Sequence, residues 1–231
     1  MIVRSDSRLS YEYSSEIWYD EEFNINKAAH DFGVLEDNGL EIYKNFEIGK
    51  VSLPVYLYIL NGSSEIGESN KTPLGLLHIE PEIGPVKLLG SFSYTKYDAR
   101  DSLNETRWAA GAIYTAGGFS VRGEVMGGNS QGKIRVGTTY RDASGTGFYI
   151  KPFYQVAKWG KVGVDFSYAD EKTDAANDHD KDLTITPLLI FIPSAGINII
   201  SQNEIGIWTR NNLKNQKLNY FRSTLGVRCT F

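Results

Sequence analysis

The sequence is poor in the residues on which several common protein classes depend. It has three histidines and one cysteine, Cys229, which cannot form an intramolecular disulfide and which we interpret as a small apolar residue on a strand. It has no run of lysine and arginine, and its net charge of −4 disfavours nucleic acid as a partner. Its longest apolar stretch, residues 187–200, is interrupted by Pro193, Ser194 and Asn198, so we expect no bilayer-spanning helix.

The start of the chain also lacks the apolar core of a secretory signal peptide. Residues 1–6 read Met-Ile-Val-Arg-Ser-Asp, which is too short and too polar for such a core. For an exported protein, we therefore expect that the printed chain is either a mature form or begins partway through its gene.

What the sequence does have is a series of segments of about ten residues in which polar and apolar side chains alternate. The clearest covers 161–170, where Val162 and Phe166 share one face and Lys161 and Asp165 share the other. Similar segments cover 32–44, 49–60, 73–81, 85–96, 105–115, 119–125, 147–157, 182–192, 199–210 and 218–231, with a doubtful one at 9–19. The pattern predicts an all-β protein of about 11 to 12 strands.

The connections between these segments alternate in length. The short ones cover 45–48, 82–84, 116–118, 158–160 and 193–198, and the longer, more polar ones cover 61–72, 97–104, 126–146, 169–181 and 211–217. Short turns at one end and long loops at the other are typical of an antiparallel transmembrane β-barrel of the bacterial outer membrane. A strand-like segment at 133–140 is placed within a long external loop, because a further spanning strand would upset this alternation.

Three prolines inside predicted strands count against a fully regular sheet. Pro54, Pro152 and Pro187 cannot donate to a ladder, so we expect at least one of these strands to be bulged or misread. A soluble β-sandwich or solenoid also has alternating strands, but a sandwich has no reason to sort its loops by length. We therefore prefer the barrel over residues 31–231, preceded at 1–30 by an N-terminal segment with a partial strand and an external loop.

The last predicted strand gives a second indication of an outer-membrane barrel. Between residues 218 and 231, the apolar residues Phe221, Leu225, Val227 and Phe231 share one face. A terminal phenylalanine after such alternation resembles the C-terminal signal that outer-membrane barrels present to the barrel-assembly machinery. Phe231 is therefore the predicted assembly signal.

Four other segments resemble the phosphate-selective porin family of the porin O/P type. Residues 31–34 are similar to that family's Asp-x-Gly-Val strand start, and 55–62 to its strand that closes on Asn-Gly. Residues 117–124 are similar to its Gly-Pro-Phe-Ser-x-Arg-Gly-Glu turn and strand, with Gly118 in place of proline, and 158–168 occupy the place of a short turn and strand. The resemblance implies a trimeric porin of about 16 strands per barrel, of which this chain would form the C-terminal part.

An inward face follows if Phe231 faces lipid and the more apolar face of each strand points outward. Its pore-lining candidates are Lys87, Arg107, Arg122, Glu124, Lys151, Lys161, Asp165, Arg222 and Arg228, and its other acidic members are Glu41, Glu80, Asp182 and Glu204. Basic and acidic groups nearly balance, so no ring selective for phosphate is evident. A structural alternative is that Arg122 with Glu124, and Lys161 with Asp165, form ion pairs that stiffen the wall.

Aromatic rings near strand ends or on outward faces are expected to form girdles at headgroup depth. These rings are Tyr43, Tyr94, Trp108, Tyr114, Tyr154, Trp159, Phe166 and Tyr168.

Catalytic and metal sites are disfavoured by the sequence. His78 alternates with Glu80, but nothing local supplies a nucleophile to complete a Ser-His-acid site. The acidic residues around His179 match no calcium loop, so we predict no metal and no cofactor.

The sequence therefore predicts a non-enzymatic outer-membrane porin that conducts small hydrophilic solutes or ions, including anions such as phosphate. The expected partners are outer-membrane lipid, these solutes, the barrel-assembly machinery and two further copies of the chain. The alternative is a non-conducting barrel that acts as an anchor or adhesin through its external loops.

Overall fold

The structure, a computed structural model, describes residues 3–6, 36–60, 73–97, 103–136, 139–173, 178–210 and 216–229. These residues form one antiparallel sheet of 13 strands, which confirms the predicted fold class. The strands are β1 (Val3–Asp6), β2 (Glu36–Ile48), β3 (Val51–Leu60), β4 (Leu74–Ile79), β5 (Glu82–Ile83), β6 (Val86–Tyr97), β7 (Leu103–Ala116), β8 (Phe119–Val136), β9 (Thr139–Ala157), β10 (Gly160–Thr173), β11 (Asp178–Ser194), β12 (Ile197–Arg210) and β13 (Gln216–Cys229). None of the described residues forms a helix long and apolar enough to cross a membrane.

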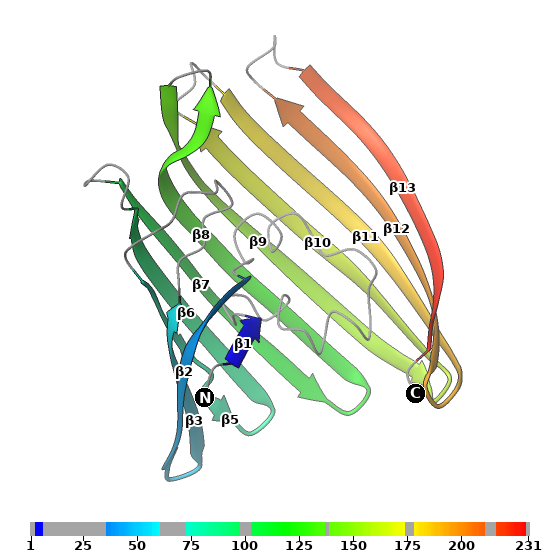
Figure 1. The fold of residues 1–231 in the computed structure, drawn as a ribbon. Helices are drawn as coiled ribbons and strands as arrows, with labels where there is room; N and C mark the ends of the chain where they lie inside the picture. Colours follow the sequence, from blue (N-terminus) through cyan, green and yellow to red (C-terminus); the bar gives the residue numbers. More distant parts are fainter. Residues whose placement is uncertain are drawn as a thin grey trace.

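The strands follow one another across the sheet in chain order, and β4 and β5 share one position between β3 and β6. Figure 1 shows that the sheet curls into an open trough of tilted strands. Within the described ranges, β1 is paired with β2 and β13 with β12, but β1 and β13 are not paired with each other. Because an unsatisfied backbone group costs several kcal/mol in hydrocarbon, both edges need a further partner in a membrane.

Tight turns close the hairpins at one end of the trough (Figure 1). The two-residue turn of the β2–β3 hairpin is Gly49–Lys50, and Gly49 has a φ of 64°, in the left-handed region that favours glycine. The predicted turn at 45–48 was therefore wrong, because β2 continues to Ile48 and the chain reverses where glycine permits it. The other tight turns occupy 84–85, 117–118, 158–159 and 195–196.

The predicted long loop at 126–146 is instead the end of a long hairpin. β8 and β9 stay paired as far as Val136 and Thr139, with a register shift between Ser130 and Ile134. The segment 133–140, predicted as part of a loop, therefore belongs mostly to strands, because β8 and β9 pair again beyond this register shift. β10 and β11 extend into the predicted loop 169–181 in the same way. The doubtful strand at 9–19 lies outside the described residues, and β1 was not predicted.

The three strand prolines do not bulge their strands, contrary to expectation. The β9–β10 ladder lacks a partner pair at Pro152, and the β11–β12 ladder lacks one at Pro187, yet the register is unchanged on either side. Each proline remains paired on its other side, Pro152 with Val121 and Pro187 with Val164. Pro54 accepts a hydrogen bond from the Glu80 N–H at 3.0 Å. One intact ladder per proline is therefore enough to keep the register.

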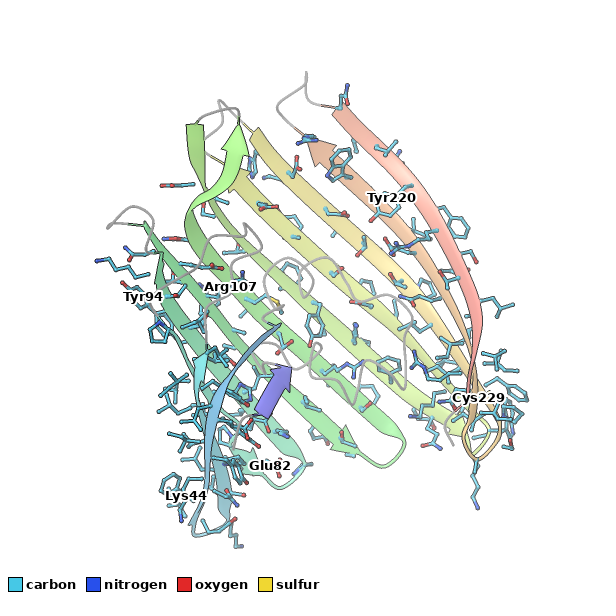
Figure 2. All side chains as sticks on the ribbon, in the orientation of Figure 1. Lys44, Glu82, Tyr94, Arg107, Tyr220 and Cys229 are labelled. Carbon is cyan, nitrogen blue, oxygen red and sulfur yellow. The ribbon has the colours of Figure 1, made fainter. Side chains whose placement is uncertain are left out.

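Burial separates the two faces of the sheet. The residues of one face, which we call the inward face, are mostly buried, and they include Tyr58, Met126, Lys151 and Thr184. The other, outward face exposes large apolar side chains, and these include Leu57, Phe92, Val125, Phe148, Ile150, Phe166, Ile185, Leu189, Ile205 and Phe221. Such an extensive exposed apolar surface is rare on soluble monomers and is typical of a surface that faces lipid. Figure 2 shows the side chains of both faces on the curled sheet.

Two inward glycines make room for aromatic rings on neighbouring strands. Gly206 of β12 lies opposite Tyr220 of β13, and Gly163 of β10 lies opposite Phe153 of β9. A Cβ atom added to either glycine would overlap the ring of its partner. The rings therefore lie directly over the glycine backbone, which fixes their direction along the inward face.

We predict that Gly206→Val destabilises the barrel by about 1–3 kcal/mol, because the new side chain must displace the Tyr220 ring. The matched control is Gly75→Val, since a Cβ at outward Gly75 has no atom within 4 Å. The folded fraction can be measured as a function of urea by the mobility difference between unheated and heated samples in gel electrophoresis. Equal urea midpoints for the two variants would contradict the prediction.

Candidate pore lining

The register places all of the predicted inward residues on one face of the sheet. Arg122 of β8 lies opposite Lys151 of β9, and Glu204 of β12 lies opposite Arg222 of β13. The remaining members follow by alternation along their strands. This agrees with the predicted face of each residue, whereas their role in lining a pore stays a prediction. Phe231, the predicted assembly signal, lies outside the described residues.

The middle of the inward face carries a group of interacting residues that we call the central charge cluster, comprising Arg122, Glu124, Tyr149, Lys151 and Asp165. Lys151 Nζ lies 3.2 Å from Asp165 Oδ2, and the two side chains are 0% and 4% exposed. The Tyr149 hydroxyl donates to Glu124 Oε2 at 2.5 Å, and Lys151 Nζ lies 5.2 Å from the Tyr149 ring centroid. The cluster therefore joins β8, β9 and β10 through side chains.

Asp165 is thus paired across strands with Lys151, whereas the sequence suggested Lys161. Lys161 and Asp165 are four residues apart on one strand, a separation of about 13 Å, but directly opposite residues are only about 5 Å apart. Arg122 also lies against an aromatic ring, with its guanidinium 5.3 Å from the centroid of Phe153.

A second group of side chains lies toward the tight-turn end of the inward face. His78 of β4 hydrogen-bonds through Nδ1 to Ser91 Oγ of β6 at 2.6 Å, and through Nε2 to Glu80 Oε1 at 2.9 Å. Lys87 Nζ lies 2.9 Å from Glu80 Oε2 and 3.2 Å from Glu82 Oε1. We call these five residues the His78 network. Sequence reasoning missed Ser91, although alternation from the predicted inward Lys87 would have placed it on this face.

The order Ser91, His78 and Glu80 is that of a Ser-His-acid site, but its surroundings differ from those of a hydrolase. Such an enzyme needs a nucleophile within reach of substrate and N–H donors aimed at the oxyanion. Ser91 is only 7% exposed and His78 is fully buried. Both lie on regular strands whose backbones take part in ladders. The geometry therefore supports a network that ties β4 to β6.

Polar contacts also join the last strands of the sheet. The Tyr220 hydroxyl of β13 reaches across β12 and donates to Asp182 Oδ1 of β11 at 3.1 Å. Arg222 forms an ion pair with Glu204. These contacts cross-link β11, β12 and β13 on the inward face.

The inward face carries more acidic residues than the sequence predicted. Among the residues whose side chains the structure describes, the additional acids are Glu47, Glu82, Glu105, Glu171 and Asp180, and the additional base is Arg210. Most lie near strand ends, where the predicted strands stopped too early. Among the described residues, no group of three or more His, Cys, Asp or Glu side chains could hold a metal ion.

Aromatic side chains mark both borders of the outward apolar face. Tyr154 and Trp159 are exposed near the tight turns, and Tyr94 and Trp108 are exposed toward the other end. Tyr43 was wrongly predicted to belong to a girdle, because it lies opposite Tyr56 on the inward face with a centroid distance of 4.7 Å.

We predict that Lys151→Met or Asp165→Leu alone destabilises the protein by about 3 kcal/mol or more, because each leaves a buried charge without its partner. The double variant should recover a large part of that loss. Urea midpoints of the wild type, both single variants and the double variant give the coupling energy of the pair. Additive losses would show that the two side chains do not act as a pair.

No protein-family model and no curated protein sequence matches this chain. Among solved structures, it is similar to the outer membrane channel DcaP of Acinetobacter baumannii, with 14% identity and a TM-score of 0.64, covering 91% of this chain and 67% of that one. It is also similar to OmpT of Vibrio cholerae expressed in the outer membrane, with 12% identity and a TM-score of 0.62, covering 94% of this chain and 73% of that one. A structure of OmpT of Vibrio cholerae folded in vitro has 11% identity and a TM-score of 0.54, covering 82% of this chain and 63% of that one. The chain thus spans about two thirds of the length of these structures. They show the fold, a bacterial outer-membrane β-barrel, and confirm the predicted localisation, while the phosphate-selective porin family stays a resemblance.

Proposed function

We propose that the protein is a porin, which lets small hydrophilic solutes and ions diffuse passively through a water-filled barrel. The observation that carries this proposal is the difference between the two faces of the sheet. Charged and hydroxyl-bearing side chains occur on the inward face from β2 to β13, whereas the outward face is largely apolar. A lumen filled with water accounts for such an inward face, because water solvates charges that a packed apolar interior would exclude.

The charges of the inward face support cations rather than phosphate as the preferred ions. The resemblance to phosphate-selective porins implies a lining rich in arginine and lysine. On the described inward face, acids outnumber bases once Glu47, Glu82, Glu105, Glu171 and Asp180 are included. An excess of fixed negative charge raises the concentration of cations in a pore.

Passive transport is also our preferred proposal over an enzymatic role, because the buried His78 network lacks the exposed nucleophile of a hydrolase. The second candidate is an anchor or adhesin that acts through its external loops. It is supported by the β8–β9 hairpin, which projects beyond the neighbouring strands (Figure 1). Conductance distinguishes the two candidates, since an anchor needs no open lumen.

We predict that the purified full-length protein gives discrete conductance steps in a planar bilayer. We also predict that Lys161→Gln shifts the reversal potential of the channel toward greater cation preference. Lys161 lies on the inward face, so its loss removes a positive charge from the lumen. Lys44→Gln is the matched control, because exposed Lys44 lies on the outward face. A silent bilayer from folded protein would refute the porin proposal, and equal shifts from both variants would refute the assignment of faces.

We further propose that copies of the chain associate through β12 and β13, in line with the trimer that the resemblance implies. Ser201, Asn203 and Ser223 form a hydrogen-bonded polar group among apolar residues on the outward face there. Asn203 donates to Ser201 Oγ at 3.1 Å and accepts from Ser223 Oγ at 2.7 Å. Nearby Phe221 and Leu225 are 65% and 75% exposed. Polar groups are unfavourable against acyl chains, so contact with a second copy accounts for them better than lipid does.

We predict that Asn203→Leu dissociates the oligomer, since it removes both hydrogen bonds at the centre of this patch. The mass of the protein in detergent, measured by light scattering, should fall to that of one chain. Val125→Leu on the outward face of β8 is the control and should leave the mass unchanged. A wild-type protein that is already monomeric, or an unchanged mass for Asn203→Leu, would refute the proposed interface.

A further inference from the structure

A polar hollow opens on the outward face, at the end of the sheet opposite the tight turns. It has a volume of about 370 Å³ and is lined by residues of β7, β8, β9 and β10. One row of its lining crosses the strands through directly opposed residues, which are Thr106, Asn129, Ser144 and Lys172. The next row contains Trp108, Gly127, Thr146 and Asp170. We call this site the outward hollow.

Glycines form the floor of the hollow. Gly128 and Gly145 line it with backbone atoms alone, because their Cβ positions point to the inward face. Gly127 is the outward glycine and lies between Trp108 and Thr146. At Gly127, an added Cβ would lie 2.7 Å from the Gly145 carbonyl oxygen and 3.0 Å from both Thr146 Cγ2 and Trp108 Cζ2. A larger residue at Gly127 would therefore displace the walls, whereas glycine leaves the indole of Trp108 beside an open polar space.

The position of the hollow relative to the apolar band fixes its depth in the membrane. The next outward residues toward the tight turns are Val125, Phe148 and Tyr168, of which Val125 and Phe148 are prominently exposed. The hollow thus begins where the band that faces acyl chains ends. Tight turns in barrels of this class lie on the periplasmic side, so the opposite end, with the hollow, lies at the outer leaflet.

The chemistry of the lining suits a sugar that carries a phosphate. Hydroxyl and amide groups of Thr106, Asn129, Ser144 and Thr146 offer donors and acceptors, and Trp108 offers an apolar ring. The ammonium group of exposed Lys172 can pair with a phosphate oxygen.

Neighbouring groups already neutralise the one acid in the lining. Asp170 is hydrogen-bonded to His179 Nε2 and lies 3.5 Å from Lys181 Nζ, and it accepts a hydrogen bond from the Tyr168 hydroxyl at 3.1 Å. The carboxylate is therefore engaged within the wall, and Lys172 gives the opening its positive charge.

We propose that the outward hollow binds the phosphorylated sugar headgroup of a glycolipid in the outer leaflet. The sugar stacks on Trp108 and hydrogen-bonds to the row of hydroxyl and amide groups, while the phosphate pairs with Lys172. The acyl chains then continue over the exposed side chains of Val125 and Phe148. This inference rests on the outward face and on the outer-membrane location, so it does not depend on whether the lumen conducts.

The test uses the full-length protein purified in a detergent without a sugar headgroup, with diphosphorylated lipid A as the probe. Native mass spectrometry over a concentration series should show a saturable bound molecule. Lys172→Gln and Asn129→Leu should each weaken its binding about five- to tenfold, with one charge–phosphate contact or one hydrogen bond lost. Lys158→Gln, in the tight turn at the other end, is the control and should not change binding. The gel mobility shift establishes that each variant is folded.

Comparison probes show whether the phosphate and the sugar are both recognised, and whether the ligand is a lipid or a soluble molecule. Dephosphorylated lipid A and phosphatidylglycerol, which lack the phosphate and the sugar respectively, should both bind more weakly than the intact probe. Equal binding of all three, or equal losses for Lys172→Gln and Lys158→Gln, would overturn the proposal in favour of nonspecific attraction to lipid. Competition by free glucosamine 1-phosphate at the same concentration as lipid A would also overturn it, since the ligand would then be a soluble sugar phosphate.

Discussion

The need to pair every backbone N–H and C=O group within the membrane is the constraint on which the rest of this structure depends. No water is present in hydrocarbon to satisfy these groups, so the strands must bond to each other along their whole length. The described strands do this through antiparallel ladders between consecutive segments. Even Pro152 and Pro187, which interrupt one ladder each, stay paired on their other side. The ladders force an extended backbone, and an extended backbone sends successive side chains to opposite faces.

That alternation explains why charged residues and exposed apolar residues occur in the same strands. In β9, Tyr149 and Lys151 point inward while Phe148 and Ile150 point outward. The outward residues remain exposed because lipid is their solvent, and the inward ones can be charged where water or a partner is available. Where burial is complete, as at Lys151, the charge has Asp165 within 3.2 Å. On the crowded parts of the inward face, polar residues are therefore paired with one another, as in the central charge cluster and the His78 network.

Period-two alternation also sets how much the sequence could predict. It identified the segments that became β2 to β4 and β6 to β13, and the inward face of each predicted charge, because both depend on local pattern alone. The short strand β5 was missed, since its residues were read as part of a turn at 82–84. It could not identify partners, since these depend on the register between strands. Asp165 faces Lys151 because of where the β9–β10 turn lies, and Ser91 meets His78 across the β4–β6 ladder. The misplaced turn at 45–48 also explains the error at Tyr43, because the predicted boundary placed this residue near a strand end. Tyr43 in fact shares the inward face of Glu41, and β2 continues beyond it to Ile48.

The two proposed sites, the lumen and the outward hollow, occupy opposite faces of the same strands and so impose separate demands on alternate residues. In β10, Asp165 belongs to the central charge cluster, while Asp170 and Lys172 belong to the hollow. A substitution in one set does not contact the other set, because the two sets lie on opposite faces of the sheet and are connected only through the shared backbone. Glycine is the exception, because Gly127 and Gly128 are adjacent in β8 and point to opposite faces. Close neighbours surround both positions, so a side chain at either would strain the ladder that supports both sites.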